Sequence, residues 1–260
     1  MVLALLYSFS TTTELADTNF TLENYTTIFT SMHKLVRFIN SFHFSILTVI
    51  LTFLFSFPIA YFLAKKISPI KGGIIVALLV APMFMSDVIR LFGWSQFFIK
   101  YGLLNIILDN YLHLGKTSFL YTPMVTLFGQ VYLYYPYMLF PIYIAISNID
   151  DDILNAARDL GANGWDIFKD MLIGMSKPGI LIGCALTFAL SFADHLCSAL
   201  LGGGSITTVG DLIHFDFGYG RNWNAGSAEA IITTAILFVI GFVVLSRVDI
   251  ERLIVGRHEI

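Results

Sequence analysis

Two neighbouring polar residues, Asp194 and His195, interrupt a long apolar stretch of the sequence. On a continuous helix, Asp194 lies about 24 Å from Pro178, which opens the stretch. Ionisable groups are expensive among apolar residues, so each is a functional candidate. A carboxylate there attracts an organic ammonium group, which places Asp194 on a candidate substrate pathway. The structural alternative is a hydrogen bond from Asp194 to His195 or to a neighbouring helix.

A second pair of charged residues, Asp87 and Arg90, has the spacing i and i+3. Side chains at this spacing lie one turn apart on the same helix face. The two residues therefore either pair with each other or leave Asp87 on the pathway.

Gln130 and Tyr135 belong to a run rich in tyrosine, together with Tyr132, Tyr134 and Tyr137. Aromatic faces hold organic cations by cation–π contact, so Gln130 and Tyr135 are further pathway candidates. The alternative is the belt of tyrosines that membrane proteins place at the lipid–water interface.

Motifs for catalysis and for metal binding are absent from the sequence. Its six histidines are scattered without any i, i+4 pair, so no metal site is expected. Neither HExxH nor GxSxG occurs, and no P-loop lysine follows the glycines 202–204. We expect a chain that is not an enzyme and binds no cofactor itself. Its net charge of −3 also argues against a nucleic-acid partner.

The composition indicates that lipid is the solvent for much of the chain. Among the 260 residues, 57% are hydrophobic and only 13% are charged, and the mean hydropathy is +0.77. Soluble domains carry charge on about a quarter of their residues.

Five apolar runs approach the length of about 20 residues that a membrane-spanning helix needs. They are residues 42–64, 72–94, 117–149, 178–201 and 230–246. The run at 1–9 is too short to cross, and we interpret it as the stub of a sixth span, with a frayed interfacial N-terminus as the alternative. The sequence thus predicts an all-α polytopic membrane protein with five complete transmembrane helices, built as a single domain over residues 1–260.

The lysines and arginines beside the spans set the expected orientation, because such residues stay in the cytoplasm during insertion. Lys65, Lys66 and Lys71 lie in one short loop. Alternate crossing from this loop places residues 150–177 and the C-terminus on the same, cytoplasmic side.

The cytoplasmic loop 150–177 has the pattern of two short amphipathic helices. Asp151 or Asp152 can cap the first, and Gly161 can end it in a left-handed conformation. Its apolar residues share one helix face: Ile153, Leu154, Ala157 and Leu160. Asn163 can cap the second helix, which carries Trp165, Phe168 and Leu172 at i, i+3 and i+7 before Pro178 opens the next span.

Residues 155–162, NAARDLGA, resemble the E-A-A-x-x-x-G coupling motif of the permease subunits of bacterial ABC importers. The family continues after nine residues with I-x-L-P, where this sequence has MLIG at 171–174. Asn155 therefore replaces the leading acid and Gly174 replaces the proline. Further likeness lies at residues 20–25, 87–90, 132–136 and 221–223, and within the family it points to the spermidine/putrescine type.

This resemblance implies the type I ABC importer permease fold, with 150–177 as the coupling-helix loop. The residues it assigns to ATPase coupling are Asn155, Ala156, Ala157, Asp159, Leu160 and Gly161. It also implies four partners in the bacterial inner membrane: a dimer of ABC ATPase subunits that bind ATP and magnesium, a second permease subunit, an extracytoplasmic solute-binding protein and membrane lipid.

The substrate that the resemblance implies is a polyamine, spermidine or putrescine. The alternatives are an ABC permease for sulfate, molybdate, iron(III) or thiamine, a passive channel, or an intramembrane enzyme. An anionic solute calls for cationic groups at depth, whereas Asp194 is acidic. A passive channel has no need of a cytoplasmic docking helix.

Overall fold

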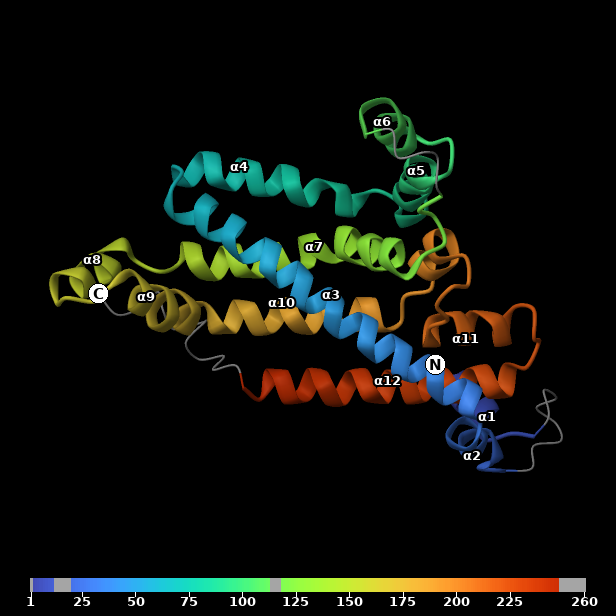
Figure 1. Ribbon diagram of the computed structural model, residues 1–260. Helices are drawn as coiled ribbons and strands as arrows, with labels where there is room; N and C mark the ends of the chain where they lie inside the picture. The colour runs from blue at the N-terminus through green and yellow to red at the C-terminus, as the bar shows by residue number, and fades with distance from the viewer. Residues whose placement is uncertain (1, 12–19, 113–117, 248–260) are drawn as a thin grey trace. The chain divides into compact units, whose positions relative to one another are not determined.

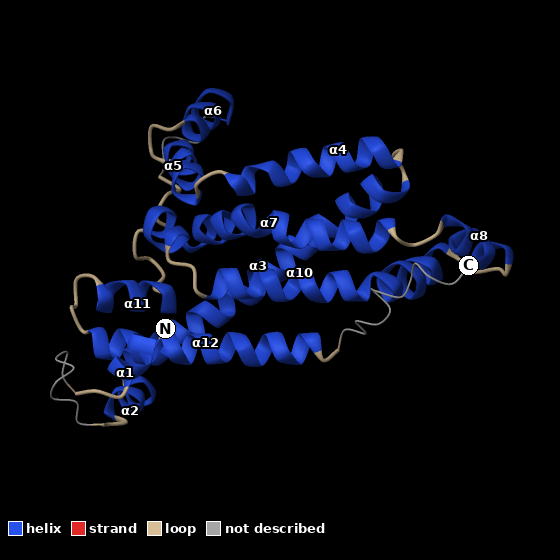
Figure 2. Ribbon diagram, turned by 180° about the vertical axis from the view of Figure 1, so that it is seen from behind, coloured by secondary structure: helices blue, strands red, loops and turns tan. Residues whose placement is uncertain are grey.

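The computed structural model of the chain describes residues 2–11, 20–112 and 118–247, and these residues are almost entirely helical (Figure 1). Their only β-type pairing is an isolated antiparallel bridge between Ser10 and Phe20, and Figure 2 shows no strand among them. The all-α prediction is confirmed for this part of the chain.

Twelve α-helices and three shorter helical segments follow one another along the described residues. The α-helices are α1 (Val2–Ser8), α2 (Glu23–Thr30), α3 (Met32–Lys65), α4 (Pro69–Val80), α5 (Asp87–Phe98), α6 (Leu103–Leu112), α7 (Pro123–Ser147), α8 (Asp151–Asp159), α9 (Gly164–Asp166), α10 (Gly174–Phe192), α11 (Val209–Phe217) and α12 (Trp223–Leu245). The 3₁₀ helix η1 covers Ala81–Phe84, and the π-helices η2 and η3 cover Ile167–Ile173 and Ser198–Gly202.

Four helical stretches of the described residues are long and apolar enough to cross a membrane. They are Met32–Lys65, Asp87–Asp109, Gly164–Phe192 and Trp223–Val244, of which the second comprises parts of α5 and α6. α7 has 25 residues, but it is not among the four, because its tyrosines and prolines lower its hydropathy. The predicted count of five complete spans remains a prediction.

Two of the predicted runs are not continuous helices. Residues 72–94 divide into α4, η1 and α5: Pro82 lies in η1, and Met85 is extended with ψ of 153°. Residues 178–201 divide after Phe192, the last residue of α10, because the chain turns at residues 193–195 before η3. Proline removes a backbone donor from the helix, which favours the first break.

By its contacts the chain divides into two compact units. Unit 1 is drawn from Met1–Thr48, Ser86–Tyr132 and Ala189–Val239, and unit 2 from Val49–Met85, Leu133–Phe188 and Ile240–Ile260. The two units are described separately.

Unit 1 buries an unusual number of small polar side chains. On α3, Ser41, Ser45 and Thr48 recur at helical spacing and are all fully buried. Ser41 accepts a hydrogen bond from the backbone N–H of Val209, the first residue of α11, at 2.8 Å. Buried hydroxyls that bond to a neighbouring helix join helices where no water competes.

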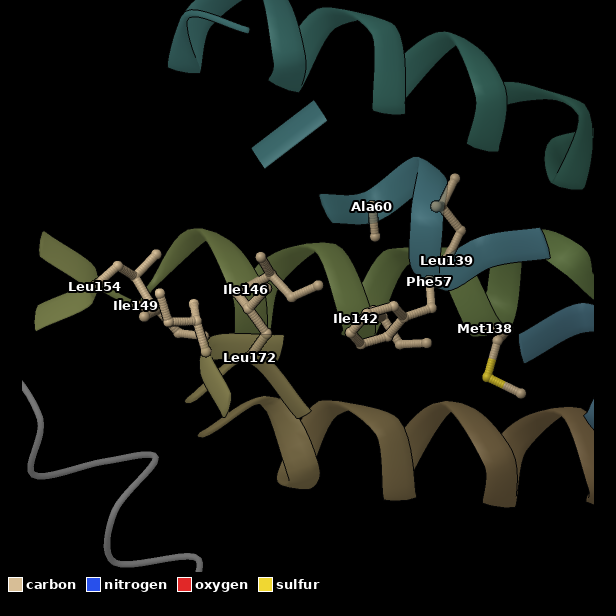
Figure 3. Packing of buried hydrophobic residues seen from close by; sticks show 10 residues of the cluster. Phe57, Ala60, Met138, Leu139, Ile142, Ile146, Ile149, Leu154 and Leu172 are labelled. Atoms are coloured by element: carbon tan, nitrogen blue, oxygen red, sulfur yellow. The ribbon is translucent and has the colours of Figure 1, made fainter. Parts of the chain in front are cut away.

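Unit 2 packs around an apolar cluster that joins α3, α7, α8 and η2 (Figure 3). Its buried members are Phe57, Ala60, Met138, Leu139, Ile142, Ile146, Ile149, Leu154, Ile167 and Leu172. α10 approaches α7 closely, because a Cβ at Gly179 would lie 2.5 Å from the Pro141 carbonyl oxygen. Only glycine allows this separation, which is typical of packed membrane helices.

Candidate functional site

The predicted helical hairpin at residues 150–177 is present, and its first arm is α8. The side chain of Asp150 caps α8 by accepting the backbone N–H of Asp152 at 3.0 Å. The prediction that Asp151 or Asp152 is the cap is therefore wrong by one residue, because both acids already lie in the first turn. Acidic residues there are favourable to the helix dipole.

Gly161 ends α8 as predicted. Its φ is +89°, and the N–H groups of Gly161 and Ala162 bond back to the carbonyls of Arg158 and Ala157 at 2.9 and 3.0 Å. This pair of bonds is the Schellman motif, which favours glycine because other residues resist positive φ.

The second arm begins as predicted but does not stop where predicted. Asn163 and Asp166 form a reciprocal capping box around α9. The chain then continues through η2 into α10, so Pro178 lies inside a helix and does not open one. The π-helical turn links the two segments without a break.

The predicted apolar face of α8 is divided between two environments. Leu154 and Ala157 are buried, and Leu154 belongs to the same cluster as Ile167 and Leu172. Leu160 is 90% exposed, and Ile153 is also exposed. The motif residues that face outward with Leu160 are Asn155, Ala156, Asp159 and Gly161.

The beginning of α8 is tied to α3 and to the chain just after α7. Lys65, the last residue of α3, forms an ion pair with Asp151 at 2.8 Å and also donates to the carbonyl of Ile149, just beyond α7. A pocket of about 430 Å³ opens beside the hairpin. Tyr61 of α3 and Arg158 of α8 supply its polar lining.

Asp194 lies in the turn that follows α10 and not inside a helix as predicted. Its side chain is 6% exposed, and its carboxylate accepts the backbone N–H of Cys197 at 3.3 Å, which caps the next helical turn. Its backbone carbonyl accepts the hydroxyl of Thr208, the cap of α11, at 2.9 Å. A short acidic side chain thus stabilises the helix break that the hydropathy pattern does not reveal.

The structure brings Gln130 and Asp194 together. The Gln130 side-chain amide donates to the Asp194 carboxylate at 3.2 Å and accepts the hydroxyl of Thr48 at 2.9 Å. Gln130 and Thr48 are fully buried. The alternative reading of Asp194, a bond to a neighbouring helix, therefore has a defined partner on α7.

Of the other pathway candidates, Asp87 belongs to the same unit as this network, where α5 contacts η3. Asp87 and Arg90 form the ion pair expected from their spacing on α5, and the Asp87 side chain remains 45% exposed. Tyr135 belongs to unit 2, where it packs partly buried against the apolar cluster.

The sequence reasoning missed a second buried charged cluster in unit 1. Lys34 of α3 lies 2.6 Å from Glu229 of α12 and 3.7 Å from Asp216 of α11. Glu229 immediately precedes the apolar run at 230–246, whereas α12 already begins at Trp223. Because α12 begins six residues before Glu229, this acid lies in the interior of the helix.

No group of metal ligands is apparent in the described part of the chain. No three residues among its histidines, cysteines, aspartates and glutamates gather as metal ligands. Both cysteines, Cys184 and Cys197, are free thiols.

Comparison with known proteins finds relatives that align with most of this chain. The spermidine/putrescine transport system permease protein PotB of Haemophilus influenzae is 34% identical over 86% of this chain and 78% of its own length. PotB of Escherichia coli is 31% identical over 84% of this chain and 79% of its own length.

Solved structures share the fold at low sequence identity. A bacterial alginate ABC transporter, solved in complex with an alginate pentasaccharide-bound periplasmic protein, matches with a TM-score of 0.71 at 15% identity, covering 92% of this chain and 85% of that chain. A second structure of a bacterial ABC transporter that imports alginate matches with a TM-score of 0.66 at 16% identity, over 95% of this chain and 87% of that chain.

The family model of binding-protein-dependent transport system inner membrane components matches residues 5–250. With this match over nearly the whole sequence, the chain belongs to the family of binding-protein-dependent transport system inner membrane components.

Proposed function

We propose that this chain is the permease subunit of an ATP-driven importer of polyamines such as spermidine and putrescine, in a bacterial cytoplasmic membrane. The named relatives, which align over most of their own length, support the substrate class. The acidic character of the buried network at Asp194 is consistent with a cationic cargo, because a carboxylate lowers the free energy of a nearby ammonium group.

The observation that carries the coupling role is the outward face of α8. The helix has a cap at each end and a buried side, so its position is fixed within unit 2. Its other side presents Ala156 and the 90% exposed Leu160, which no residue of unit 2 covers in the described chain. A small and an apolar residue on one exposed turn suit a cleft in a partner ATPase.

Contacts near the N-terminal end of α8 can transmit a displacement of this helix to its neighbours. Lys65 joins α8 to the end of α3, and Leu154 joins it to η2 and thereby to α10. A displacement of α8 by an ATPase would therefore move the ends of both helices. Alternating access needs such a link between the ATPase and the spans.

In this proposal the chain has five complete spans, and its C-terminus lies in the cytoplasm. The contact between Lys65 and Asp151 supports the orientation, because it brings the basic loop after α3 beside the hairpin. A second permease subunit, a solute-binding protein and two ATPase subunits would complete the importer, and the ATPase subunits would bind ATP and magnesium.

The test is uptake of labelled spermidine by cells that express the complete importer and lack other polyamine importers. We compare wild type with Leu160→Arg, which places a charge on the exposed face of α8, and with Ser68→Arg as a matched control. Ser68 is exposed in the loop after α3, and its side chain makes no capping bond. We expect Leu160→Arg to lose both uptake and the co-purifying ATPase, whereas Ser68→Arg keeps them.

Two results would contradict the proposal in different ways. If wild type accumulates sulfate or thiamine but no spermidine, the substrate class is wrong. If Leu160→Arg retains the ATPase as fully as Ser68→Arg does, α8 is not the coupling helix. A C-terminal fluorescent-protein fusion that folds only in the cytoplasm tests the orientation separately.

A further inference from the structure

The charged cluster of Lys34, Asp216 and Glu229 holds two carboxylates and one ammonium group. All three residues belong to unit 1 and come from different helices, α3, α11 and α12 (Figure 1). The Lys34 ammonium nitrogen forms a 2.6 Å hydrogen bond with Glu229 Oε1 and lies 3.7 Å from Asp216 Oδ2. One ammonium group therefore faces two carboxyl groups in this cluster.

The two carboxyl groups of the cluster differ in their exposure. The Glu229 side chain is 0% exposed, and its Oε2 atom has no hydrogen-bond partner among the described residues. Asp216 and Lys34 are 12% and 16% exposed, so they form the edge that a solute can reach. A buried carboxylate oxygen without a partner is strongly unfavourable unless a donor arrives.

The nearest additional cation on α3 does not neutralise the cluster. Arg37, one turn after Lys34, bonds through Nη2 to the His33 ring at 3.0 Å. It makes no ion pair with Asp216 or Glu229 in the part of the chain that the structure describes. Among the described residues of unit 1, no second cation forms an ion pair with Asp216 or Glu229.

We infer that Asp216 and Glu229 form a binding site for a primary ammonium group, which Lys34 partly fills as a tethered ion. The lysine side chain ends in the same group that a polyamine carries at its ends, so its contacts indicate how a cargo amine is held. Three N–H donors on one nitrogen suit the unpartnered Glu229 oxygen together with the Asp216 carboxylate. The cargo amine joins Lys34 in the cluster or displaces it.

This inference rests on the proposed import of polyamines and assigns them a site distinct from Asp194. It makes Lys34 a competitor of the cargo. A neutral residue at position 34 should increase the affinity for an amine, whereas a neutral residue at position 216 should abolish the site.

Asp216→Asn is the decisive variant, because it leaves the 2.6 Å pair of Lys34 and Glu229 intact. The cluster then has one cation and one anion, and it no longer attracts a second ammonium group. The matched control is Asp151→Asn, which removes another carboxylate that pairs with a lysine. Asp151 is 69% exposed and lies in unit 2.

The measurement is the melting temperature of the purified full-length chain in detergent, titrated with butylammonium or with tetramethylammonium, which has no N–H donor. We expect butylammonium to raise the melting temperature of wild type and of Asp151→Asn but not of Asp216→Asn. Lys34→Met should reach its half-maximal shift at a roughly tenfold lower butylammonium concentration, equivalent to about 1.4 kcal/mol. Tetramethylammonium should have no effect on any of them.

Equal shifts in wild type and Asp216→Asn, or equal shifts with the two ammonium ions, would overturn the inference. If Lys34→Met does not fold without an amine, the variant is purified in the presence of either ammonium ion. We then expect folded protein with butylammonium and none with tetramethylammonium. Spermidine uptake is measured separately. If the importer carries spermidine, but butylammonium shifts the melting temperature of Asp216→Asn as much as that of wild type, the site alone is refuted. An importer with the site but without spermidine uptake refutes the proposed substrate alone.

Discussion

The network at Asp194 and the outward face of α8 use polar and apolar residues in opposite ways. At Asp194, acidic and amide groups lie inside unit 1, where Gln130 and Cys197 bond to the carboxylate. On α8, the apolar Leu160 lies at the surface of unit 2. The carboxylate of the first region has hydrogen-bond donors in its own unit, whereas the described residues of unit 2 leave Leu160 exposed.

Because of this difference, substitutions in the two regions should affect stability and function separately. Substitutions in the Asp194 network should lower the free energy of unfolding, because they leave buried donors without acceptors. Substitutions on the outward face of α8, apart from Gly161 with its left-handed backbone, should leave that free energy almost unchanged and weaken partner binding. The unfolding free energy of each variant is measured on the purified chain in detergent.

The largest expected effect is that of Asp194→Ala. It removes the acceptor of the Gln130 amide and of the Cys197 N–H, so we expect a loss of about 2–3 kcal/mol. Asp194→Asn keeps one oxygen acceptor and should lose less than half of this amount. An Asp194→Ala chain as stable as wild type would show that the network is not stabilising.

Gly161→Ala should come next, with a loss of about 1–2 kcal/mol from its left-handed backbone. A Cβ at Gly161 would meet no heavy atom within 4 Å beyond its chain neighbours, so the loss reflects φ of +89° and not a clash. Gly161→Asn should recover part of it, since asparagine tolerates this conformation. Equal stability of the alanine and asparagine variants would contradict the explanation.

Thr48→Val should have a smaller effect of about 0.6 kcal/mol, typical of a hydrogen bond between membrane helices. It removes the 2.9 Å bond to Gln130 but keeps the shape of the side chain. Thr52→Val is the control on the same helix, because the Thr52 hydroxyl bonds to the Val49 carbonyl of its own helix at 3.1 Å. A larger loss at Thr52 would argue against interhelical bonding as the cause.

Leu160→Ser should have the smallest effect on stability, within about 0.5 kcal/mol of wild type. The same variant should reduce the amount of ATPase that co-purifies with the importer. Leu154→Ser is its counterpart on the buried side of α8 and should destabilise the hairpin instead. Similar unfolding free energies for the two variants would abolish the distinction between the faces.

Local chemistry made the hairpin predictable from the sequence. Gly161 and Asn163 act on neighbouring backbone groups, and both do so as predicted. The cap of α8 was misplaced by one residue, because Asp150, Asp151 and Asp152 all have a suitable side chain. Sequence reasoning resolves a cap to a residue only when the competing residues differ in type.

Long-range pairing explains what the sequence did not predict. Thr48, Gln130 and Asp194 are far apart in the chain, and nothing in their spacing indicates that they meet. The pairing of Lys34 with Glu229 spans 195 residues. The break after Phe192 was hidden for a related reason, since its cap is an acid inside an apolar run, where hydropathy shows only an interruption.

The π-helical turn of η2 has a consequence for how relatives of this chain can differ in length. A π-helix closes its hydrogen bonds across five residues where an α-helix uses four, so Ile167–Ile173 holds one residue more than α-helical winding requires. Deletion of a single residue there can be absorbed by a return to α-helical bonding. The same deletion within α10 would rotate all later side chains by about 100° around the helix axis. Single-residue length differences among relatives should therefore fall within residues 167–173, which act as a buffer between the hairpin and the span.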